Sequence, residues 1–216
     1  MSRLVLLGAG ACVLMIGLAA WRLHENDSTD SPLVVKTKPP EAAPQCPWRE
    51  PEADLKSFFP EAIDYRLETH ILSGARAELG ARLGRVPTGD ENLLRTFAVS
   101  SGDQFIGNIM TERVKGEYGA IEFVLATDPQ GVVRGLRLQR IREPDVVEKA
   151  LSAQAVSEWF IGRCSTNSWA AGSGLPPVPR AAEPSARAIV EGARSLLVRL
   201  EIATTLSREG SGTHQH

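Results

Sequence analysis

Hydrophobic and polar positions in the middle of the chain predict a β-hairpin. Residues 118–126 are almost continuously apolar, which is typical of a strand that is covered on both faces. Residues 128–131 read Asp-Pro-Gln-Gly, which predicts a type I turn. Leu136 and Leu138 then alternate with polar residues within residues 132–141, so a partner strand with one solvent-exposed face follows the turn.

Weaker patterns before the hairpin predict a short helix and two more strands. Residues 54–59 form the expected helix, and Pro60 ends it. Residues 95–99 and 105–114 are the expected strands.

Two helical patterns follow the hairpin. Residues 146–163 carry apolar side chains at helical spacing, with a break near Ser152. Beyond a Gly/Pro-rich loop, apolar residues recur every three or four positions and predict an amphipathic helix, with Pro184 in its first turn. The predicted fold class is therefore α+β, an antiparallel sheet flanked by helices.

Residues 4–21 form an apolar run without a charge, which predicts a transmembrane helix. A helix of this length spans roughly 27 Å, close to the thickness of the hydrocarbon core of a bilayer. A cleaved signal peptide is the alternative, because small residues stand at positions 17, 19 and 20. Trp21 and Arg22 suit a membrane interface and favour a retained anchor. With Arg3 ahead of the run, we expect one pass through the inner (cytoplasmic) membrane and a C-terminal domain in the periplasm.

The rest of the chain divides into a tether, a domain and a tail. We expect an anchor over residues 1–25, a proline-rich tether over 26–53, the α+β domain over 54–207 and a flexible tail over 208–216. Cys46 in the tether and Cys164 in the domain either form a disulfide or remain thiols, since spacing does not establish proximity.

Composition excludes several classes of function. The formal net charge is -2 and no basic cluster occurs, so a nucleic-acid partner is not expected. Four histidines are scattered and no Cys-x-x-Cys motif is present, so no metal site is predicted. No nucleophile elbow, zinc-protease helix or phosphate-binding glycine loop appears, and no catalytic residue is predicted; whether the chain is an enzyme stays open.

From about residue 58 to residue 206 the chain resembles the FMN-binding domain family. Four segments carry the resemblance: residues 59–62 (Phe-Pro-Glu-Ala), the hairpin 118–136, residues 140–144 (Arg-Ile-Arg-Glu-Pro) and residues 159–163 (Trp-Phe-Ile-Gly-Arg). Members of this family are flavin-bearing, membrane-anchored subunits of sodium-pumping quinone reductases and related electron-transfer complexes. The resemblance implies extracytoplasmic electron transfer beside other subunits of a membrane redox complex.

The sequence departs from the family at the site of covalent flavin attachment. Family members attach the FMN phosphate to a threonine in Ser-Gly-Ala-Thr, just before the last helix. Glu183 stands where that threonine belongs, and a carboxylate does not form this linkage. The histidine of the family's His-x-Glu-Thr-Pro-Gly segment is also missing, and Pro144 and Asp145 replace the Thr and Gly that come after the family's Glu. Covalent FMN is therefore not expected.

Two hypotheses remain for the cofactor. In the first, FMN binds noncovalently, with its phosphate near Ser185, Arg187 and the N-terminus of the last helix, and Arg140, Arg142 and Glu143 address the ring or ribityl chain. In the second, the domain has lost FMN and is a structural or assembly subunit of a membrane redox complex. Each residue also has a simpler explanation: a solvated helix arginine, an early-helix hydroxyl, and an exposed Arg142–Glu143 pair.

Overall fold

The computed structural model describes residues 52–166, 169 and 174–212. The chain separates into two units, Met1–Gln45 and Cys46–His216, and the described residues all belong to the second unit. The predicted anchor, almost all of the predicted tether, and Cys46 lie outside the described residues. None of the helices in the described ranges is long and apolar enough to cross a membrane.

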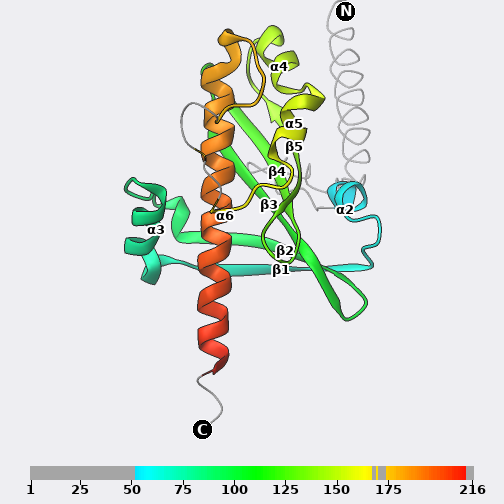
Figure 1. Ribbon diagram of the computed structural model, residues 1–216, viewed down its shortest axis with the longest axis vertical. Helices are drawn as coiled ribbons and strands as arrows, with labels where there is room; N and C mark the ends of the chain where they lie inside the picture. Colours follow the sequence, from blue (N-terminus) through cyan, green and yellow to red (C-terminus); the bar gives the residue numbers. More distant parts are fainter. Residues whose placement is uncertain (1–51, 167–168, 170–173, 213–216) are drawn as a thin grey trace, which may run out of the picture. The chain divides into compact units, whose positions relative to one another are not determined.

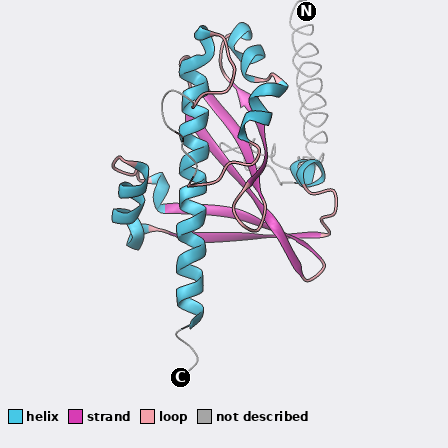
Figure 2. Cartoon of the chain, viewed as in Figure 1, coloured by secondary structure: helices cyan, strands magenta, loops and turns pink. Residues whose placement is uncertain are grey.

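Five strands form one antiparallel sheet in which neighbours in the chain are neighbours in the sheet (Figures 1 and 2). The strands are β1 (Asp64–Ile71), β2 (Leu93–Ser101), β3 (Gln104–Lys115), β4 (Ala120–Thr127) and β5 (Val133–Ile141). The predicted antiparallel α+β fold class is confirmed for this part of the chain. β1 was not predicted.

The predicted hairpin is β4 and β5 with the turn between them. Asp128 accepts hydrogen bonds from the backbone N–H groups of Gln130 (2.9 Å) and Val132 (2.8 Å) through Oδ1. Gly131 closes the turn at φ 79°, a left-handed conformation that glycine adopts without strain. The sequence therefore predicted this turn for the correct physical reason.

Five helices are described: α2 (Glu52–Phe58), α3 (Arg76–Leu83), α4 (Asp145–Leu151), α5 (Gln154–Phe160) and α6 (Glu183–Gly212). Short 3-10 turns occur at Ser73–Ala75, Asp90–Asn92 and Arg180–Ala182. The break predicted near Ser152 separates α4 from α5, and Pro184 occupies the first turn of α6. α6 continues to Gly212, so the first residues of the predicted tail are helical, whereas α3 was not predicted.

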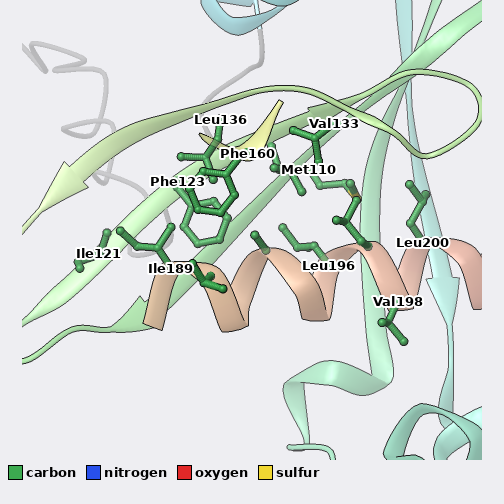
Figure 3. Close-up of a cluster of buried hydrophobic side chains, with 14 of the residues drawn as sticks. Met110, Ile121, Phe123, Val133, Leu136, Phe160, Ile189, Leu196, Val198 and Leu200 are labelled. Carbon is green, nitrogen blue, oxygen red and sulfur yellow. The ribbon is translucent and has the colours of Figure 1, made fainter. Parts of the chain in front are cut away.

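Both faces of the sheet are covered, which explains why β4 is apolar except at Glu122 and Thr127. Ile121, Phe123 and Leu125 belong to the main core with residues of α4, α5 and α6. Figure 3 shows Ile189 and Leu196 of α6 directed toward this core. Val124 and Ala126 point to the opposite face and pack in a smaller core with Leu55 of α2, Phe59 and two other strand residues. All strand residues from 121 to 127 are buried.

The sheet divides between β2 and β3. These strands pair only as far as Phe97 opposite Ile109. Beyond that point β2 pairs only with β1, as far as Leu93, and β3 pairs only with β4, as far as Lys115. Figure 1 shows that β1 and β2 run in a different direction from β3, β4 and β5. We call the space between the separated ends of β2 and β3 the fork.

Candidate functional site

Ser185, in the first turn of α6, is fully buried and already hydrogen-bonded to the protein. Its Oγ accepts the backbone N–H of Glu117 at 2.9 Å. Glu117 lies in the turn between β3 and β4, which the Gly116 N–H closes by donating to the Gly119 carbonyl at 2.8 Å. The side chain predicted to meet a phosphate therefore holds a backbone turn.

Glu143, just after β5, holds the same turn from another side. Its carboxylate accepts hydrogen bonds from the backbone N–H groups of Tyr118 (3.2 and 3.4 Å) and Gly119 (3.2 Å). Only 8% of Glu143 is exposed, so the explanation as an exposed Arg142–Glu143 pair is wrong for this residue. A buried carboxylate needs such donors, because burial without them is costly.

Glycine at position 116 is required by the closeness of these two side chains. A Cβ on Gly116 would stand 2.1 Å from Oε1 of Glu143, 3.0 Å from Oγ of Ser185 and 2.8 Å from Cδ1 of Ile121. We call Glu143, Ser185 and the turn over residues 116–119 the Glu143–Ser185 cluster. The cluster is filled by the protein's own atoms.

The three predicted arginines do not join this cluster. Arg140 is opposite Glu122 in the β4–β5 register and therefore lies on the face of the sheet that α2 covers. Arg142 and Arg187 are exposed, and within the described ranges none of the three arginines forms an ion pair. The structure thus brings together two of the five predicted residues and leaves the other three at the surface.

A cavity of about 830 Å³ lies at the fork, at the N-terminal end of β2 and the C-terminal end of β3. Ligand sites in proteins commonly have this volume. α6 contributes Ser195 and Arg199 to its lining, and none of the five predicted residues lines it. This fork cavity was not predicted.

Glu91 anchors one wall of the fork cavity. Arg85 donates two hydrogen bonds to its carboxylate (2.6 and 2.8 Å), the Thr88 N–H donates at 2.7 Å and Ser195 Oγ at 2.6 Å. Burial alone would raise the pKa of Glu91, but these donors outweigh it and lower the pKa to about 2. The carboxylate is therefore ionised at neutral pH and fixes α6 to the loop before β2.

Arg199 spans the fork. It donates to Glu112 of β3 through Nη2 and to the Leu93 carbonyl of β2 through Nη1 at 3.3 Å. Only 6% of the Arg199 side chain is exposed. Burial raises the pKa of Glu112 against the lowering influence of Arg199. One buried guanidinium thus bonds both separated strands.

Three buried side-chain oxygens that belong to lining residues of this cavity have no hydrogen-bond partner among the described residues: Thr111 Oγ1, Glu122 Oε2 and Gln139 Oε1. Arg113 Nε approaches the other Glu122 oxygen at 3.6 Å. Buried oxygens without donors are rare in folded proteins, and these three lie beneath the cavity surface with almost no accessible area of their own.

A sequence signal for the fork cavity was available. Arg199 interrupts the apolar run of α6, and Ser195 and Glu191 precede it by four and eight residues, on the same helical face. A charged residue within an apolar stripe requires a buried partner. Its partners, the Leu93 carbonyl and the Glu112 carboxylate, are 106 and 87 positions away, which no local pattern reveals.

Cys164 lies at a second cavity, of about 880 Å³, beside β1 and the C-terminal half of α6. Its Sγ is 3.2 Å from Thr166 Oγ1. The sequence left open whether Cys164 forms a disulfide with Cys46 or remains a thiol, and Cys46 lies outside the described ranges. In the part of the chain that the structure describes, no group of three or more His, Cys, Asp or Glu side chains is placed to hold a metal ion.

Comparison with solved structures finds one of the subunits of the Na(+)-translocating NADH-quinone reductase from Parabacteroides distasonis. The TM-score is 0.45 and the sequence identity 12%, over 69% of this chain and 81% of that chain. No protein-family model matches the chain. No curated protein matches it. These comparisons assign neither a family nor an activity.

Proposed function

We propose that this chain is a cofactor-free structural or assembly subunit of a membrane electron-transfer complex. In this proposal the N-terminal segment is the membrane anchor, and the α+β domain is extracytoplasmic with an FMN-binding-domain-like organisation. The observation that carries the proposal is the buried Glu143 carboxylate beside Ser185, at the end of α6 where the resemblance places the flavin phosphate.

Electrostatics disfavour a flavin phosphate at this end of α6. A phosphate that reached Ser185 would stand near the Glu143 carboxylate. Two like charges about 5 Å apart repel by about 3 kcal/mol at an effective dielectric constant of about 20. Glu183, at the start of the same helix, adds a second carboxylate. The favourable field of a helix N-terminus, worth about 0.3–1 kcal/mol, does not offset this repulsion.

Steric overlap also disfavours a flavin phosphate at this end of α6. The turn over residues 116–119 occupies the space between Glu143 and Ser185, and even a methyl group on Gly116 would overlap the Glu143 carboxylate. A phosphate would have to displace this turn and leave the N–H groups of Glu117, Tyr118 and Gly119 without their acceptors. The residues present therefore do not fit FMN at this position.

Added FMN tests the proposal. A ligand that binds only the native state at about 100 times its dissociation constant stabilises it by about 2.7 kcal/mol. For a domain of this size that corresponds to about 5–10 °C in the midpoint of thermal unfolding. We expect millimolar FMN to leave the midpoint of the full chain in detergent unchanged, and the chain to be isolated from its membrane together with redox-active polypeptides. A saturable rise in the midpoint would refute the cofactor-free role.

A second function is favoured by the fork cavity, which has the volume for a noncovalent flavin and has the cationic side chains of Arg113 and Lys115 among its lining residues. Under this alternative, FMN raises the unfolding midpoint and Arg113→Ala, on the cavity wall, reduces the rise. Arg187→Ala, at the α6 end, would leave the rise intact. This pair of variants separates the two possible positions of a flavin.

A further inference from the structure

β1 is an edge strand with an exposed apolar stripe. Within the described residues it pairs on one side only, with β2. Leu67 and Ile71 of β1, and Ile63 just before it, stand at every fourth position and are 54%, 72% and 75% exposed. An edge with unpaired backbone groups and exposed apolar side chains is a template for pairing with another strand.

The backbone of β1 presents its odd-numbered residues to the open edge. Leu72 N–H donates to the Asn92 carbonyl at 2.7 Å, so residue 72 is directed toward β2. Hydrogen-bonding direction alternates along an antiparallel strand, which turns the N–H and C=O groups of Tyr65, Leu67, Thr69 and Ile71 away from β2. Tyr65 N–H agrees with this, because it bonds the side chain of Asp64 at 2.8 Å. The alternation ends before the strand, at Ile63, whose N–H donates to the Ser100 carbonyl of β2 at 3.0 Å.

We propose that β1 pairs with β1 of a second copy of this chain, antiparallel, with a two-fold axis at Leu67. Two identical antiparallel strands place odd residues opposite odd residues when the axis passes through Leu67, as the outward backbone groups require. This register sets complementary side chains opposite each other: Leu67 and Leu67, Arg66 and Glu68, Asp64 and His70, Ile63 and Ile71, Tyr65 and Thr69.

Charge complementarity selects this register over its neighbours. A shift of the axis by one residue in either direction places Arg66 opposite Arg66 or Glu68 opposite Glu68. Like charges directly opposite each other destabilise a strand pair, whereas opposite charges stabilise it. Arg66 forms an ion pair with Glu68 of its own strand, and the two side chains are 79% and 30% exposed, so the same pair from a second copy adds to this one at the edge. The two-fold symmetry makes each favourable pair occur twice.

Charge reversal tests the dimer. The oligomeric state of the full chain in detergent is measured by sedimentation over a range of protein concentrations. Glu68→Arg and Arg66→Glu, each alone, should weaken dimerisation by about tenfold, since every reversal affects two symmetric pairs. The double variant R66E/E68R restores opposite charges and should recover the parent dimer. Glu158→Arg, an exposed reversal on α5, is the matched control and should dimerise like the parent.

A cysteine on the two-fold axis tests the proposed register of the β1–β1 pairing. Hydrogen-bonded antiparallel pairs have Cα atoms about 5.5 Å apart, within the range that a disulfide spans. Leu67→Cys should therefore give covalent dimers on mild oxidation, above the level of the parent chain, and Val86→Cys should not. Circular dichroism establishes that each variant is folded. A parent chain that is monomeric at all concentrations, or dimers that the single reversals leave unchanged, would overturn the proposal.

Discussion

Removal of the Glu143 side chain is the most informative perturbation of the Glu143–Ser185 cluster. Glu143→Ala deletes the acceptor for the N–H groups of Tyr118 and Gly119 and leaves space beside Gly116. We expect the turn between β3 and β4 to lose one of its two attachments, while the Ser185 hydrogen bond remains.

The magnitude follows from the contacts. Hydrogen bonds to a charged group contribute about 1.5–3 kcal/mol each, and donors left without a partner cost a similar amount. The bonds here are long, 3.2–3.4 Å, so we take the lower part of that range for the two donors. The expected loss in free energy of unfolding is about 2–4 kcal/mol, which lowers the unfolding midpoint by about 5–12 °C.

Denaturant and thermal unfolding, followed by circular dichroism, measure this loss. Glu143→Gln keeps the shape and one acceptor oxygen and should lose about half as much. Glu117→Ala changes the same residue type in the same turn, where the side chain is exposed, and should lose less than about 0.5 kcal/mol. If Glu143→Ala unfolds like Glu117→Ala, the carboxylate does not hold the turn and the reasoning is wrong.

Three further predictions concern nearby packing and charge. Gly116→Ala should destabilise the protein by about 1–3 kcal/mol in denaturant unfolding, because its Cβ overlaps Glu143; a neutral result would show that the turn is not confined. Arg199→Met should lower the free energy of unfolding by about 3 kcal/mol, because it leaves Glu112 without its partner, and adding Glu112→Gln should recover part of this loss. If Arg199→Met and the double variant lose the same free energy of unfolding, the two residues are not coupled. The pKa of Glu91 falls from its ordinary 4.5 to about 2 on folding, so its contribution is present above about pH 5 and lost as pH falls toward 2. Glu91→Gln should flatten the stability curve over that window, and an unchanged curve would contradict the assignment.

The sequence predicted elements whose pattern is local. The β4–β5 hairpin and α6 were recognised because an apolar strand, an Asp-Pro-x-Gly turn and a three-and-four repeat are set by neighbouring residues. β1 was missed because Arg66, Glu68 and His70 alternate with residues that stay exposed, which leaves no core-facing stripe. α3 was missed because only Leu79 and Leu83 of its eight residues are buried.

The candidate site was predictable only in part. Ser185 and Glu143 were selected by a family resemblance, yet their role as acceptors for a backbone turn depends on contacts across 68 and 25 positions. The fork cavity depends on the point where β2 and β3 stop pairing, which no side-chain pattern reveals. Long-range registry therefore limits what the sequence alone establishes here.

The flavin content of the full chain, isolated from its own membrane, tests the central claim most directly. The chain is extracted in mild detergent, separated from its partners and denatured in acid, and the absorbance of the supernatant is recorded across the visible flavin bands. We predict no flavin, because Glu143 and the turn over residues 116–119 occupy the space at the N-terminal end of α6 where the FMN phosphate would lie. One flavin released per chain would contradict the account.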